Sequence, residues 1–183
     1  MLQILEHASS SYGPRTRHNA NLADLTIAIA IDFTTAGERL TKAAAGKRFI
    51  SSAITADPLV VARLLYRRLR AARGRTLNIA GNGIYTLAQH GWTQEWVNEF
   101  VYQVLLPVHT YWPLEGVVCG GQTGVDLAGA ISAVALGIDT VVTMPKGRLQ
   151  RGIDKVDRCN SEDEMVKQVT AGVESLARFG KAQ

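Results

Sequence analysis

Hydrophobic residues in this chain gather into short runs that are separated by amphipathic stretches. The run 25–31 is almost wholly apolar and rich in β-branched residues, and shorter strand-like segments occupy 48–51, 76–80, 116–119 and 140–144. An apolar run without polar alternation is typical of a strand that is buried on both faces, as in a parallel sheet. The pattern therefore predicts five strands of such a sheet.

Helices are predicted between these strands, at 36–45, 58–73, 93–106 and 125–136. A C-terminal helix is expected within 161–183, where Ser161-Glu162-Asp163-Glu164 forms a capping-box sequence. The alternation of strands and helices predicts an α/β fold: a doubly wound, mostly parallel sheet with helices on both faces, of the Rossmann-like type. We expect one domain over 1–183, with 1–21 as an irregular N-terminal segment because these residues are mostly polar.

Composition narrows the class of protein. The chain has 183 residues, with 20 Lys and Arg against 16 Asp and Glu, and only two cysteines. No apolar run approaches the ~18 residues that a membrane span needs, and the N-terminal residues lack the pattern of a secretory signal. We therefore expect a cytoplasmic protein with no membrane partner. The mild basic excess fits a small anionic ligand and is a weak argument for nucleic acid.

Glycine-rich or polar turns follow three of the predicted strands, at 32–37, 78–83 and 120–124. In an open α/β sheet, ligands bind beyond the carboxyl ends of the strands. Glycines let the backbone approach a ligand, and the N-terminus of the next helix attracts an anion. We therefore expect a phosphate or carboxylate at 120–124, with the amides of Asn78 and Asn82 near a base or ribose.

Each of these features also has a purely structural interpretation. The glycines at 120–124 could form a tight strand-to-helix corner, with Thr123 as the helix cap and Asp126 as its partner. Glu38 could in the same way be the capping-box partner of Thr35. Asn82-Gly83 could be a simple turn. The four histidines lack metal-ligand spacing, so no metal site is expected.

Residues 120–126, Gly-Gly-Gln-Thr-Gly-Val-Asp, closely resemble the GGQTGxD motif of the molybdenum-cofactor carrier family. That family belongs to the SLOG superfamily, which also includes the LOG enzymes and the DprA-type Rossmann domain. Further similar pieces are Tyr12, Arg15-Thr16, Asn19, Ala23–Thr26, Gly37, Leu40-Thr41, Ala44, Gly46-Lys47, Asp57-Pro58, Leu77–Gly81, Gly83–Tyr85, Ala135–Ile138 and Pro145–Arg148. In the family the GGQTGxD half comes first, so this chain resembles a circular permutant. It departs from the family pattern at Leu127, where the family usually has Arg, and at Thr35-Ala36-Gly37, which replaces a double glycine.

The resemblance implies a small phosphorylated ligand derived from a nucleotide, such as a cyclic ADP-ribose isomer or a cyclic nucleotide. The protein would be a carrier, sensor or sponge of that ligand, in a homodimer or higher homo-oligomer. No cofactor is required, although a nucleotide or pterin nucleotide could be bound. The expected ligand-binding residues are Gly120, Gly121, Gln122, Thr123, Gly124, Asp126, Asn78, Gly81, Asn82, Thr35, Gly37, Arg15 and Lys146. Tyr85 or Phe33 is expected to stack on a base.

Two other functions stay open. The LOG enzymes hydrolyse an N-glycosidic bond in a nucleoside monophosphate, and Glu38 and Asp126 are the candidate catalytic acids here. Neither stretch reproduces the hydrolase motif PGGxGTxxE, so a second carboxylate or an arginine poised on Glu38 or Asp126 would be the discriminating feature. A DprA-like nucleic-acid-binding domain is the other alternative, because Arg63, Arg67 and Arg70 share one helix face. A solvated basic face explains the same arginines more simply.

Overall fold

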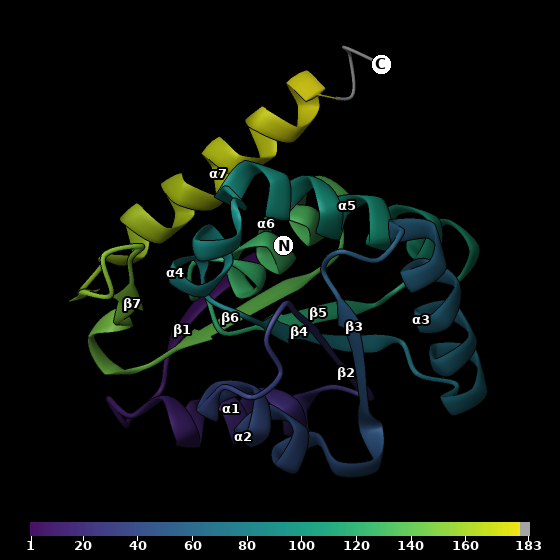
Figure 1. Cartoon of the computed structure of the whole chain (residues 1–183), viewed down its shortest axis with the longest axis horizontal. Coiled ribbons are helices and arrows are strands. Elements are labelled where there is room, and N and C mark those ends of the chain that lie inside the picture. Colours follow the sequence, from purple (N-terminus) through teal and green to yellow (C-terminus); the bar gives the residue numbers. More distant parts are fainter. Residues whose placement is uncertain (180–183) are drawn as a thin grey trace.

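Six parallel strands form the central sheet of the protein (Figure 1). The structure is a computed structural model and describes residues 1–179. The strands are β1 (Leu2–Glu6), β2 (Leu25–Ala30), β3 (Phe49–Ala53), β4 (Thr76–Gly81), β5 (Gly116–Cys119) and β6 (Thr140–Met144). Their order across the sheet is β1-β6-β5-β4-β2-β3. The predicted parallel sheet is confirmed, and β2 is buried along its whole length, as its apolar run predicted.

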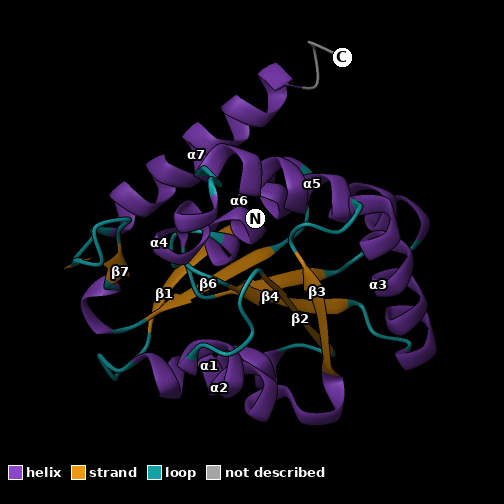
Figure 2. Ribbon diagram, in the orientation of Figure 1, coloured by secondary structure: helices purple, strands orange, loops and turns teal. Residues whose placement is uncertain are grey.

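Helices cover both faces of this sheet, so the doubly wound architecture is also confirmed (Figure 2). On one face α1 (Tyr12–Leu22) packs against α2 (Ala36–Ala45). The other face carries α3 (Pro58–Ala72), α5 (Gln94–Tyr111), α6 (Val125–Ala135) and α7 (Glu162–Phe179). The short helix α4 (Ile84–Leu87) and 3₁₀ turns at Gly46–Arg48, Ala88–His90 and Lys146–Arg148 complete the helical elements of the described chain.

The most deeply buried of these helices is α6, which packs between α5 and α7. Every residue from Val125 to Ala133 is buried. Small side chains permit this, and Gly129 lies directly against the side chain of Ile79 in β4. Asp126 is the charged residue in the first turn of this apolar helix, and its carboxylate is therefore carried into the interior at the end of the sheet.

The prediction of an irregular segment over 1–21 is wrong. Residues 2–6 form β1, an edge strand that is parallel to β6 and buries Ile4 alone. Residues 12–22 form α1, whose buried side chains are Arg15, Asn19 and Ala20. The sequence concealed this helix because two polar residues occupy the inward positions where an apolar stripe would be expected.

The segment after β6 was also incompletely predicted. It contains an antiparallel hairpin of two short strands, β7 (Gln150–Arg151) and β8 (Asp157–Arg158). The capping box before α7 is confirmed, because Ser161 N–H donates to Glu164 Oε2 at 2.6 Å and Glu164 N–H donates to Ser161 Oγ at 3.1 Å. The expected helix over 161–183 is observed to Phe179, and 180–183 lie outside the described residues. Within 1–179, none of the helices combines the length and apolar character that would let it cross a bilayer.

Candidate functional site

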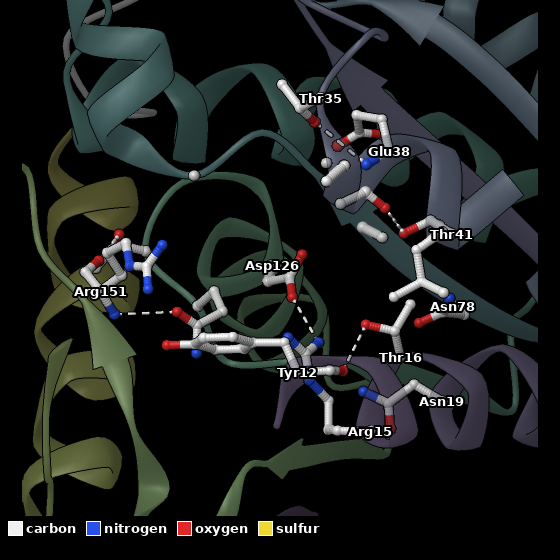
Figure 3. Close-up of a pocket in the computed structure, with 18 of the residues that line it drawn as sticks. Tyr12, Arg15, Thr16, Asn19, Thr35, Glu38, Thr41, Asn78, Asp126 and Arg151 are labelled. Atoms are coloured by element: carbon white, nitrogen blue, oxygen red, sulfur yellow. Dashed lines mark hydrogen bonds and ion pairs between the residues drawn. The ribbon is translucent and has the colours of Figure 1, made fainter. Parts of the chain in front are cut away.

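A pocket of about 390 Å³ lies at the carboxyl ends of β4 and β5, next to α1 and the start of α2 (Figure 3). Its lining comes from segments that are far apart in sequence, including all three of the turns singled out above. The lining residues are Tyr12, Arg15, Thr16, Asn19, Thr35, Ala36, Gly37, Glu38, Leu40, Thr41, Asn78, Ala80, Gly81, Gly83, Tyr85, Gln122, Thr123, Asp126 and Arg151.

Helix α1 supplies the polar side of the pocket next to the strands. Asn19 Nδ2 donates to the carbonyl oxygens of Cys119 at 3.0 Å and Thr143 at 3.4 Å, and it thereby fixes the helix to the ends of β5 and β6. Arg15 lies one turn earlier and therefore on the same face of the helix. Figure 3 shows both side chains on the α1 side of the pocket.

Arg15 and Asp126 form a buried ion pair. Arg15 Nη1 donates to Asp126 Oδ2 at 3.1 Å, and the two side chains are 8% and 7% exposed. Burial raises the pKa of the Asp126 carboxyl, while the Arg15 guanidinium and the backbone N–H groups of Gly81 and Gly120 act to lower it. Such a pair is stable in the interior only when its partners are held in good geometry.

Glu38 lies in the first turn of α2 with a buried side chain. Its N–H donates to Thr35 Oγ1 at 3.2 Å, so Thr35 is the helix cap as expected. The Glu38 carboxyl accepts from Asn82 Nδ2 at 3.3 Å and not from Thr35 N–H, so only one of the two bonds of the capping box expected for Thr35 and Glu38 is formed. Burial, followed by the nearby charge of Asp126, raises the pKa of Glu38 to about 8. Glu38 is therefore mainly protonated at neutral pH.

The two asparagines of the 78–83 segment have different positions, Asn78 within β4 and Asn82 directly after it. Asn78 lines the pocket and donates to Thr26 Oγ1 at 3.2 Å. Asn82 lies outside the lining, where its Oδ1 accepts from the N–H groups of Ile31 and Asp32, both at 2.9 Å. Asn82 thus joins the ends of β2 and β4 and holds Glu38 in place, so a simple turn does not describe its role.

The glycine turn 120–124 is built differently from the phosphate loop that we expected. Gln122 and Thr123 line the pocket, whereas Gly120, Gly121 and Gly124 lie outside the lining. Gly124 N–H donates to Gln94 Oε1 at 2.6 Å and Val125 N–H to the Asn82 carbonyl at 3.2 Å, so these donors already have protein partners. Gly124 is the N-cap residue of α6, and the Thr123 hydroxyl donates to the Arg151 carbonyl, so the capping box of Thr123 and Asp126 is not formed.

Packing explains the glycines at this turn. A Cβ at Gly120 would overlap the Arg15 guanidinium and the Asp126 carboxylate. Gly124 has φ +89°, and a Cβ there would overlap the Asn82 carbonyl oxygen. Gly120 therefore leaves room for the ion pair, and Gly124 for the backbone that follows β4. Of the two interpretations given above, this packing agrees best with a tight strand-to-helix corner.

Sequence reasoning placed some residues correctly in the pocket and missed others. Eight of the expected binding residues line the pocket: Arg15, Thr35, Gly37, Asn78, Gly81, Gln122, Thr123 and Asp126. Lys146 lies outside it. Arg151, on β7, lines the pocket although no sequence signal pointed to it. Tyr12 also lines the pocket; it matched the family pattern but was not among the expected binding residues. Of the two aromatic residues expected to stack on a base, Tyr85 lines the pocket and Phe33 does not.

The residues that line the pocket include hydrogen-bond donors and also buried polar atoms that have no hydrogen-bond partner. Among residues 1–179, five buried side-chain atoms lack a hydrogen-bond partner, and three of them belong to residues that line the pocket: Arg15 Nε, Asn19 Oδ1 and Glu38 Oε2. In the same part of the chain, no group of three or more His, Cys, Asp or Glu side chains could hold a metal ion. The arrangement suits a polar ligand that offers both donors and acceptors. Comparisons of the chain with protein-family models, curated proteins and solved structures found no match.

Proposed function

We propose that this pocket binds a small phosphorylated metabolite derived from a nucleotide. The observation that carries the proposal is that three residues lining one pocket, Arg15, Asn19 and Glu38, each hold a buried side-chain atom without a hydrogen-bond partner. Proteins pair nearly all of their buried polar atoms, and a ligand can supply the missing partners. The cavity of about 390 Å³ falls within the range of roughly 300–1,000 Å³ that small-molecule sites occupy.

The charges of the lining suggest how such a ligand would lie. Figure 3 shows Arg151 at one side of the pocket, with Glu38 and Thr41 at the other. Arginine is the residue best suited to a phosphate, because its planar fork donates two parallel hydrogen bonds. The phosphate would contact Arg151, while Asn78, Asn19 and protonated Glu38 would hold ribose hydroxyls or the edge of a base. Tyr85 offers a ring on which a base could stack.

The direct test is native mass spectrometry of the protein with a panel of AMP, ADP-ribose, cyclic nucleotides and adenosine. A one-to-one adduct with a phosphorylated member is expected, and adenosine should bind more weakly. Thr41→Ile adds bulk to the pocket and should abolish the adduct. Thr110→Ile is the matched control, because both hydroxyls donate to the carbonyl one turn earlier and Thr110 lies on α5, outside the pocket. Equal binding of AMP and adenosine would refute a phosphate-dependent site.

The biological use of the ligand distinguishes a carrier or sensor from a sponge. A stoichiometric, reversible complex with no product supports all three, and very slow release favours a sponge. Membership of the molybdenum-cofactor carrier family by circular permutation, and assembly into a homodimer or higher oligomer, stay predictions.

A second candidate, hydrolysis of an N-glycosidic bond, is favoured by one observation. A second carboxylate or an arginine next to Glu38 or Asp126 was the feature expected of a hydrolase. Arg15 contacts Asp126, and Glu38 and Asp126 line the same pocket. Glu38 is protonated at neutral pH and could donate its proton to the leaving base nitrogen as the bond to ribose C1′ breaks. The Asp126 carboxylate would stabilise the oxocarbenium-like transition state, and water would then add to C1′ and give a proton to the Glu38 carboxylate, which restores the acid.

Chromatography of the protein incubated with AMP tests this candidate. Release of free adenine and ribose 5-phosphate over several turnovers, lost in Glu38→Gln, would identify a hydrolase. If AMP binds but is recovered unchanged, hydrolysis is refuted and binding remains as the proposed function.

A further inference from the structure

The Arg151 guanidinium, which lines the pocket, is held by a carboxylate from its own hairpin. Arg151 Nε donates to Asp157 Oδ1 and Arg151 Nη2 to Asp157 Oδ2, both at 2.8 Å. The Tyr12 hydroxyl donates to Asp157 Oδ1 at 2.9 Å. Arg151 and Tyr12 both line the pocket, whereas Asp157 lies outside its lining.

We propose that Asp157 is an internal stand-in for the ligand phosphate, and that a bound phosphate replaces its carboxylate on Arg151 and Tyr12. This inference rests on the proposed function, since it assigns the phosphate subsite of the same pocket. The two-pronged contact of Arg151 is the arrangement with which an arginine grips either a carboxylate or a phosphate. An anion from the pocket side and the Asp157 carboxylate would therefore compete for the same donors.

The hairpin is built so that Asp157 can leave while Arg151 stays. The backbone of Arg151 is fixed to the glycine turn, because its N–H donates to Gln122 Oε1 at 3.0 Å and its carbonyl accepts from Thr123 Oγ1 at 2.5 Å. Asp157 and Arg158 form the outer strand β8, and both are exposed. β8 joins β7 through a ladder of two residue pairs. Exchange of one anion for another can therefore leave the backbone of Arg151 in place.

The electrostatic balance also favours this exchange. The hydrogen bonds from Arg151 lower the pKa of Asp157, so the stand-in is charged at neutral pH. The side chains of Arg151 and Asp157 are 39% and 30% exposed, and ion pairs with that access to water stabilise a protein only slightly. A phosphate carries more charge than a carboxylate, so it can displace Asp157, although the competition weakens its binding.

The experiment measures AMP and adenosine binding by calorimetry in the full chain and in Asp157→Asn. Asparagine keeps the size of the side chain and removes the competing charge. We expect AMP to bind about three- to tenfold more tightly to the variant, with adenosine binding unchanged. Asp154→Asn is the matched control, because it removes the same charge from the same hairpin but Asp154 pairs with Arg158, away from the pocket lining. Its AMP affinity should equal that of the unaltered chain.

The possible outcomes separate the two proposals. If no phosphorylated nucleotide binds the unaltered chain or its variants, the proposed function fails and the stand-in fails with it. If AMP binds the unaltered chain but binds Asp157→Asn equally or more weakly, the binding function survives and the stand-in is refuted. Weaker binding would mean that Asp157 orients Arg151, and equal binding that Asp157 does not compete for it. Asp157→Ser repeats the measurement should the asparagine variant fold poorly, and circular dichroism verifies the fold of each protein.

Discussion

The Arg15 guanidinium reaches the Asp126 carboxylate at 3.1 Å across 111 positions of sequence, and both side chains are buried. Arg15 lies on α1 and Asp126 on α6, and these helices cover opposite faces of the sheet (Figure 1). The pair therefore joins the two helical layers around the ends of the central strands. It also forms one wall of the candidate pocket.

Arg15→Met should destabilise the protein strongly, because it leaves the Asp126 carboxyl buried without its cation. A loss of about 3–5 kcal/mol in the free energy of unfolding is expected from urea titration. The double variant Arg15→Met with Asp126→Leu should recover most of that loss, since no uncompensated charge remains. A single-variant loss below about 1 kcal/mol would mean that water reaches the pair.

Glu38 should make the stability of the protein fall as pH rises. Its pKa is about 8 in the folded chain, against an ordinary value of 4.5. Between these values the folded state keeps a proton that the unfolded state has lost, so the free energy of unfolding decreases from about pH 4.5 upward and levels off above about pH 8. Glu38→Gln should remove this slope, gaining on the order of 4 kcal/mol relative to the unaltered chain at pH 8 and under about 1 kcal/mol at pH 5. Parallel slopes for the two proteins would show that Glu38 titrates normally.

Two glycine substitutions should separate folding from binding. Gly120→Ala places a methyl group on the Arg15 and Asp126 side chains and should cost about 1–3 kcal/mol of stability. Gly37→Ala meets only Thr35 Oγ1, at 4.0 Å, in the first turn of α2, so the thermal midpoint should hold or rise. Gly37 lines the pocket, however, and its added methyl should weaken AMP binding. Equal destabilisation by both substitutions would contradict the packing described here.

Gln122→Met should loosen the hairpin from the glycine turn. Gln122 Nε2 donates to the Leu149 carbonyl at 2.6 Å, and Gln122 Oε1 accepts from Arg151 N–H at 3.0 Å. Loss of both bonds should speed amide hydrogen exchange over 150–158 and weaken AMP binding, because Arg151 is no longer held toward the pocket. Gln103→Met, an exposed position on α5, is the control. Unchanged exchange in the hairpin would show that other contacts fix it.

The sequence revealed those parts of the fold in which burial follows a regular period. The β2 run is apolar throughout because both of its faces are covered, and the start of α7 at Glu162 could be predicted because the capping box of Ser161 and Glu164 is local. Helix α1 was missed because Arg15 and Asn19 occupy its inward face. Arg15 and Asn19 therefore line the pocket and at the same time break the apolar pattern by which α1 would have been predicted.

The candidate site was only partly predictable for a related reason. The position of each turn at a strand end follows from topology, so the meeting of Thr35, Asn78 and Thr123 in one pocket could be expected. Arg151 could not, because a strand of two residues leaves no periodic pattern. The glycines at 120–124 drew attention as ligand contacts, whereas a tertiary neighbour, the Arg15 side chain, fixes Gly120.

The pocket draws its walls from residues 12 to 151, nearly the whole span of the sheet. No fragment shorter than 12–151 holds all of these groups, so the cavity exists only when the sheet and the helices on both of its faces have folded. Any metabolite that occupies it would bind the native state and not the unfolded one, and would thus raise the melting temperature, with a stabilisation that grows as the logarithm of its concentration over its dissociation constant. A thermal-shift screen of metabolites would in this way search for the natural ligand without any assumption about its chemistry.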